Sequence, residues 1–131
     1  MAPILKEGDI VLAPTFLSPD KNRPVAFYSG NKLLVKRVIA RPMDYVDIKE
    51  NGDVSVNGVI LNEPWAFQKT KGEIDIELPA QVPDEKYFVL GDNRAVSIDS
   101  RYSAVGFISK NDILGYPVFR IWPIDRFGPV S

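Results

Sequence analysis

Every long apolar run in this chain has the length of a β-strand. The main runs lie at residues 32–39, 87–90 and 113–121, and no stretch of about eighteen apolar residues, the length that a transmembrane helix needs, occurs anywhere. Eleven prolines and nine glycines are spread along the 131 residues, which favours many short strands joined by turns. We therefore expect one mostly β domain made of antiparallel sheets.

Turn signals divide the rest of the chain into shorter strands. Asn51-Gly52 and Asn57-Gly58 favour type I′ hairpin turns, and Pro24 favours an edge or the start of a strand. The expected strands are residues 9–13, 24–28, 45–49, 53–56, 59–61 and 107–109, with one helical turn at 109–112. In the less regular segment 64–84 we expect Trp65 and Phe67 to be buried and residues 68–73 to form a mobile loop.

Composition excludes several classes of site. The chain contains no histidine and no cysteine, so catalysis by Ser-His-Asp or Cys-His groups, His/Cys zinc sites and disulfides are ruled out. We expect no metal and no cofactor. The net charge of −1 and the lack of basic–aromatic clusters argue against nucleic-acid binding. Paired carboxylates are available, but no sugar-binding pattern accompanies them.

The densest polar segment is residues 91–101, which read GDNRAVSIDSR and directly follow the apolar run 87–90. Seven of these eleven side chains are charged or polar. Such density indicates a hydrogen-bonded and ion-paired loop that could hold a catalytic group in place. The simpler alternative is a surface turn with solvated charges.

A second unusual segment is the run at residues 32–39, because Lys36 and Arg37 stand at its centre among aliphatic residues. Alternation along a strand places the two cations on opposite faces. A lysine held against apolar surface loses hydration, which lowers its pKa toward the range of a general base. The commoner alternative is a lysine on an edge strand whose amine reaches water.

Taken together, these segments resemble the sequence boxes of the bacterial type I signal peptidases, membrane-bound serine proteases with a Ser-Lys dyad. The matching boxes are residues 8–11 (GDIV), 36–44 (KRVIARPMD) and 91–101, and the end of the chain at 118–128 is similar to the family's closing strand. Ordered boxes over most of a chain are a far stronger signal than a single motif.

The resemblance implies a role for each matching polar residue. Lys36 would be the general base, and Ser97 would hydrogen-bond to its amine and orient it. Asp99 and Arg101 would form an ion pair that braces the loop, and Asp92 would pair with Arg37. These last four residues would have structural rather than chemical roles.

The resemblance also implies a substrate and a location. Met1, Leu5, Leu34 and Val35 would surround a shallow pocket for a small side chain, so the partners would be signal peptides of preproteins with small residues at the cleavage site. The membrane lipid surface would be the second partner, with the catalytic domain on the extracytoplasmic face of the cell membrane.

Two departures from the family pattern concern glycines and the nucleophile. Ala40 and Met43 occupy the family's glycine positions, and because a methionine resists positive φ we expect a different local turn. The nucleophilic serine would fall one position before Met1, so we expect this chain to be a catalytic fragment that is inactive as it stands.

The resemblance further implies an organisation and leaves alternatives open. Residues 1–131 would form one catalytic domain with a small inserted β subdomain at about 46–85. From general burial tendencies we expect Trp65, Trp122 and Phe127 to be core residues or packing anchors, and the alternative is that Trp122 or Phe127 faces a lipid interface. The other functions considered are a non-catalytic signal-peptidase-like pilus assembly factor, a self-cleaving repressor-type protease and a β-rich binding module.

Overall fold

The larger part of the structure is a six-stranded antiparallel sheet. The structure is a computed structural model that describes residues 10–13 and 20–119. In spatial order the strands of this sheet are β1 (Ile10–Ala13), β10 (Ile113–Phe119), β2 (Pro24–Ser29), β3 (Lys32–Ala40), β8 (Lys86–Leu90) and β9 (Ile108–Ser109). The expectation of a mostly β protein with antiparallel sheets is confirmed, since the helical structure of the described residues is one short 3-10 turn, η1 (Lys110–Asp112).

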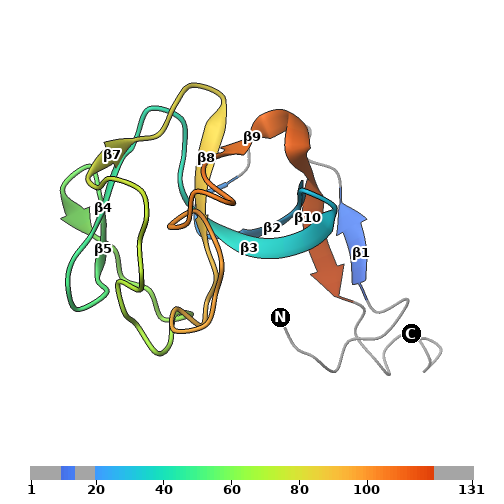
Figure 1. Ribbon diagram of the computed structural model, residues 1–131. Helices are drawn as coiled ribbons and strands as arrows, with labels where there is room; N and C mark the ends of the chain where they lie inside the picture. The colour runs from blue at the N-terminus through green and yellow to red at the C-terminus, as the bar shows by residue number, and fades with distance from the viewer. Residues whose placement is uncertain (1–9, 14–19, 120–131) are drawn as a thin grey trace.

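A second, four-stranded antiparallel sheet is formed by the chain between β3 and β8. Its order is β6 (Val59–Ile60), β5 (Val54–Val56), β4 (Tyr45–Ile48) and β7 (Ala80–Gln81). Figure 1 shows this small sheet on one side of β8, with β2, β10 and β1 on the other side. It lies within the range expected for an inserted subdomain, whose independence as a unit stays a prediction.

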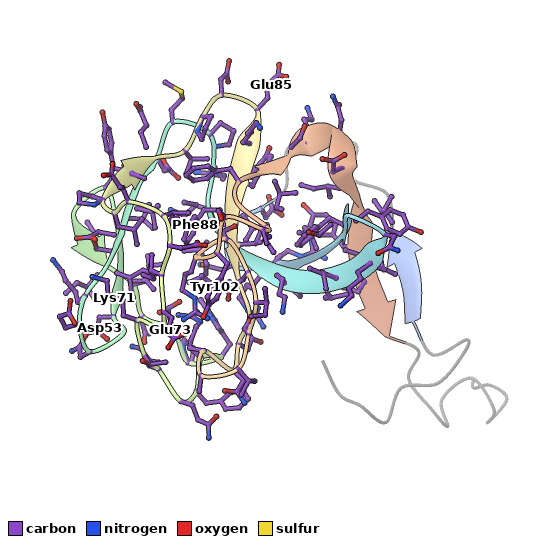
Figure 2. All side chains as sticks on the ribbon, in the orientation of Figure 1. Asp53, Lys71, Glu73, Glu85, Phe88 and Tyr102 are labelled. Carbon is purple, nitrogen blue, oxygen red and sulfur yellow. The ribbon has the colours of Figure 1, made fainter. Side chains whose placement is uncertain are left out.

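Strand β8 and the end of β3, residues 38–40, are buried on both faces, because each contributes to two hydrophobic clusters. Ile39 and Phe88 pack with the valines of β4 and β5, whereas Val38 and Val89 pack with β2, β9 and β10. Phe88 accordingly lies between the two sheets (Figure 2). Burial on both faces explains why these strands read as continuous apolar runs rather than as alternating ones.

The two Asn-Gly turns differ in the structure. In the hairpin between β5 and β6, Asn57 and Gly58 both have positive φ, as a type I′ turn requires. The prediction for Asn51-Gly52 is wrong. There the loop has three residues, 50–52, and of these only Gly52 has positive φ. The amide of Gly52 donates to the carbonyl of Lys49 and the amide of Lys49 donates to the carbonyl of Asp53, which is the pattern of a three-residue hairpin loop that ends in glycine.

The turn after β3 corrects a second expectation. Met43 has a φ of 73°, so the positive φ is kept although the residue is not glycine. Pro42 precedes it, and the amide of Asp44 donates to the carbonyl of Arg41 at 3.0 Å. The amide of Met43 also donates to the carbonyl of Val82 at 2.8 Å. This backbone bonding on both sides holds the methionine in an otherwise unfavourable conformation.

The segment between β6 and β8 is the part that sequence patterns describe least well. Strand β7 was not expected, and Phe67 is 54% exposed rather than buried. Trp65 is half-buried. The expected helical turn near residue 110 is present as η1, and the hydroxyl of Ser109 caps it by accepting from the amide of Asn111.

No helix within residues 10–13 and 20–119 has the length and apolar character needed to cross a membrane. Most of the family-like end of the chain, residues 120–128 with Trp122 and Phe127, lies outside the described residues, as do Met1 and Leu5 of the expected substrate pocket.

Candidate active site

The pairing of β3 with β8 brings the two unusual segments of the sequence together. Arg37 pairs with Leu90, the last residue of β8. Continuing this antiparallel register by one residue places Lys36 opposite Gly91, where the 91–101 loop begins. The cations of β3 therefore lie beside the polar loop, although about 55 residues separate them along the chain.

Lys36 and Ser97 form the centre of the site. The Nζ atom of Lys36 lies 3.0 Å from the Oγ atom of Ser97, and the lysine is partly buried. Burial lowers the pKa of Lys36 below its ordinary value of 10.5. The carboxylates of Asp99 and Asp92 act in the opposite direction and the cation of Arg101 adds to the lowering, so desolvation prevails. Burial thus shifts the protonation of this amine toward the uncharged form, and the hydroxyl of Ser97 accepts a hydrogen bond from it.

Gly91 provides the space for this contact. A Cβ atom at Gly91 would lie 2.0 Å from the Oγ atom of Ser97 and 3.4 Å from the Nζ atom of Lys36. The first of these distances is an outright clash. Any residue larger than glycine would therefore push Ser97 away from the lysine.

A fully buried ion pair supports the 91–101 loop from inside. Asp99 and Arg101 have no exposed side-chain area, and the Nε atom of Arg101 donates to the carboxylate of Asp99 at 2.9 Å. The same carboxylate accepts from the amide of Gly91. Arg101 also donates to the carbonyls of Arg94 and Ser97. The buried pair of Asp99 and Arg101 is thus hydrogen-bonded to the start, the middle and the end of the loop.

Arg37 joins the loop to the strand at its outer edge. Its guanidinium donates twice to the carboxylate of Asp92, at 2.9 and 2.8 Å. The guanidinium also lies over the ring of Trp65, 4.8 Å from its centre. The contact predicted between Arg37 and Asp92 is therefore present, and Arg37 makes no hydrogen bond to Ser97.

A second buried ion pair was missed in the sequence analysis. Arg94 and Glu63 have almost no exposed side-chain area, and their shortest contact is 2.6 Å. The Nε atom of Arg94 donates to the carbonyl of Gly91 at 2.7 Å. Arg94 could have been singled out as a further cation in the polar segment. Glu63 carried no signal, because it lies 31 residues earlier in an irregular segment.

A cavity of about 550 Å³ opens beside Lys36 and Ser97. Its lining residues are Pro24, Val35, Lys36, Arg37, Phe67, Gly91, Asp92, Asn93, Val96 and Ser97. Of the residues expected in a substrate pocket, Val35 lines this cavity. Leu34 does not, since it packs against the cluster formed by β2, β8, β9 and β10.

Within the described ranges, no three carboxylates gather in a way that could hold a metal ion. The other serines near the loop are engaged in structural hydrogen bonds. The hydroxyl of Ser100 accepts from the amide of Val89 and donates to the carbonyl of Gly106, and that of Ser103 bonds to Asp75. Among the described residues, Lys36 is therefore the candidate for a reacting group at this cavity.

Comparisons with known proteins point to a single family. The family described as "Signal peptidase, peptidase S26" matches residues 1–122. Signal peptidase IB of Staphylococcus aureus is 36% identical, over 97% of this chain and 75% of its own length. A protein of Synechocystis, "Probable signal peptidase I-2", is 38% identical over 94% of this chain, which spans about half (51%) of that relative.

A solved structure is also similar. The crystal structure of a signal peptidase I from Enterococcus faecalis V583 superimposes with a TM-score of 0.65 at 27% sequence identity. The match covers 78% of this chain and 98% of that one. The two-sheet architecture is therefore shared with a chain whose sequence has diverged considerably.

Proposed function

This chain belongs to the signal peptidase S26 family, and on that premise we propose that the full-length protein is a membrane-associated serine endopeptidase that removes signal peptides from exported preproteins. Full-length protein here means the gene product with any residues that precede Met1. The observation that carries the proposal is the partly buried amine of Lys36, 3.0 Å from the hydroxyl of Ser97 at the edge of a cavity.

Lys36 acts as the general base in the proposed mechanism. Its neutral amine accepts the proton of a nucleophilic hydroxyl as that oxygen attacks the scissile carbonyl. The protonated amine then gives the proton to the leaving amine, and the neutral amine that results later accepts a proton from the water that hydrolyses the acyl-enzyme. Ser97 restricts the rotation of the amine through their hydrogen bond, so that the lone pair of Lys36 faces the nucleophile.

The nucleophile in this proposal is the serine that the family pattern places directly before Met1. It is not among the 131 residues of the sequence, so we propose that this chain by itself does not cleave peptides. The oxyanion of the tetrahedral intermediate would be stabilised by the backbone N–H of that serine and by a hydroxyl two positions before it. Neither a metal nor a cofactor is required.

The proposed substrates are signal peptides with small residues at the cleavage site, bound as an extended strand next to β3. The proposed location is the outer face of the cell membrane, with the lipid surface as a second partner. The alternative of a non-catalytic pilus assembly factor gains no support from the relatives named above, each of which bears the name of a signal peptidase.

Two measurements test the proposal. The gene sequence upstream of Met1 should encode a serine at the adjacent position. The full-length protein should cleave a peptide containing Ala-Gln-Ala, and Lys36→Ala and Lys36→Arg should each abolish cleavage while the protein stays folded, as a cooperative thermal transition shows. Arginine is the sharper substitution, because it keeps the positive charge but cannot serve as a base.

Ser97→Ala should reduce kcat less than either lysine substitution, because it removes orientation and leaves the base in place. Lys32→Ala, at the exposed start of the same strand, is the matched control and should retain full activity. Near-normal cleavage by Lys36→Arg would rule out the proposed base.

A further inference from the structure

The cavity beside Lys36 and Ser97 has an apolar side that the proposed mechanism does not use. Four of its lining residues are apolar: Pro24, Val35, Phe67 and Val96. Phe67 and Val96 remain 54% and 70% exposed. Large apolar side chains that stay exposed at the edge of a concave site are candidates for ligand contact.

The backbone of Phe67 is fixed against the 91–101 loop. Its amide donates to the carbonyl of Asp92 at 3.0 Å, and its carbonyl accepts from the amide of Arg94 at 3.1 Å. These bonds form a parallel bridge between Phe67 and Asn93. The buried pair of Glu63 with Arg94 attaches the same segment to the loop four residues earlier. Phe67 is thus held at the cavity although its ring is exposed.

The backbone around Val96 is also fixed by hydrogen bonds within the 91–101 loop. It directly precedes Ser97, and the amides of both residues donate to the carbonyl of Asn93, at 3.3 and 3.1 Å. Arg101 donates to the carbonyls of Arg94 and Ser97 on either side of it. An apolar group presented on a fixed backbone can bind a ligand at little cost in conformational entropy.

We propose that Phe67 and Val96 form an apolar subsite that binds an aliphatic or aromatic side chain of the peptide substrate. The identity of the ligand as a peptide substrate rests on the proposed function. Because the subsite lines the same cavity as Lys36 and Ser97, the side chain that it binds belongs to a residue within about three positions of the scissile bond, at about 3.3 Å per residue. The subsite would favour a large apolar side chain at the substrate position that it binds, whereas the cleavage site itself favours small residues.

Cleavage kinetics test this proposal in the full-length protein. A peptide containing Ala-Gln-Ala is prepared with either leucine or serine at each of three positions before and after the scissile bond. At one position leucine should raise kcat/KM about tenfold over serine, the gain expected when most of a leucine side chain is buried. Phe67→Ser and Val96→Ser should each reduce this preference to about twofold, and Phe67→Leu should retain most of it.

Ile98→Ser is the matched control. Ile98 is 53% exposed and lies next to Ser97, but it does not line the cavity. Its substitution should leave the preference for leucine unchanged. A preference that survives both Phe67→Ser and Val96→Ser, or cleavage with no preference at any position, would overturn the subsite.

A binding measurement separates this inference from the proposed function. The 131-residue chain is titrated with fluorescently labelled leucine and serine peptides, and the anisotropy is followed. If leucine binds about tenfold more tightly and both Ser variants remove the difference, the subsite stands even when the full-length protein cleaves none of the peptides. Binding of the same variants to anionic phospholipid vesicles is measured alongside. If both variants weaken binding to the vesicles and leave peptide binding unchanged, the surface contacts lipid and the inference is wrong.

Discussion

Two polar segments of this molecule look alike in sequence and behave differently in the structure. The 91–101 loop and the hairpin tip at residues 49–53 are both rich in Asp, Asn, Gly and basic residues. In the loop, the charges of Asp99 and Arg101 are fully buried and bond to the backbone. At the hairpin tip, Asp53 pairs with Lys69 at the surface, on the outer end of the small sheet (Figure 2).

The difference shows what gives a polar segment a defined conformation. Buried charges must be paired and hydrogen-bonded, so each one restricts the backbone that supplies its partners. Surface pairs exchange their partners for water at little cost. The loop is therefore rigid because its charges are buried, not because they are numerous.

The largest difference between the two segments is expected when one aspartate is replaced in each. Asp99→Asn leaves the charge of Arg101 buried without its counter-ion, and such a loss costs about 3–5 kcal/mol. We expect a fall in Tm of about 10–20 °C by calorimetry. Asp53→Asn is the control and should leave the Tm unchanged, since its partner is at the surface. Equal effects of the two substitutions would contradict the comparison.

The second buried pair gives a test of intermediate size. Glu63→Gln should lower the free energy of unfolding by about 3 kcal/mol, measured with urea, because Arg94 would lose its carboxylate partner. The double substitution of Glu63→Met with Arg94→Met should be less harmful than the single one, since it leaves no unpaired charge. A double variant that is no better than Glu63→Gln would mean that the charges themselves are not the cause.

The turn at residues 41–44 provides a contrast to the 91–101 loop, because backbone hydrogen bonds rather than buried charges hold its conformation. Met43→Gly should stabilise the protein by about 1 kcal/mol, since glycine adopts a φ of 73° without strain and the methionine side chain is 54% exposed. Met43→Ala keeps a Cβ atom and should give no such gain. The measurement is again denaturation with urea.

Lys36 provides the smallest effect and one that depends on pH. Its pKa is lowered by burial, so between the folded pKa and 10.5 the unfolded chain binds more protons, and stability rises with pH across that window. Lys36→Met should therefore raise the Tm at pH 7, and the gain should shrink toward pH 10.5. A gain that stays constant with pH would mean that packing, rather than the charge of the amine, is responsible.

Much of this architecture could be predicted from the sequence because its signals are local. The runs of β3 and β8 are recognisable as strands, and Asp99 and Arg101 lie two residues apart in one polar segment. The partners Lys36 and Ser97 are distant in the chain and were joined through the resemblance to a family. No local pattern could have joined them.

The features that were missed depend on contacts between distant segments. Glu63 becomes important only when its segment packs on the 91–101 loop, and nothing around it in the sequence indicates burial. Met43 keeps a positive φ because Val82, just after the neighbouring strand β7, accepts from its amide. Phe67 is exposed because its backbone, not its ring, makes the contact with the loop.

The direct pairing of β3 with β8 has a consequence for how this protein can change. The separation of Lys36 from Gly91 is set by a ladder of hydrogen bonds, while the polypeptide between the two strands leaves and returns through the small sheet. Residues added at the hairpin tips would lengthen the chain but would leave Lys36 and the 91–101 loop where they are. Insertions there offer a route by which related enzymes could acquire new surfaces without rebuilding their chemistry.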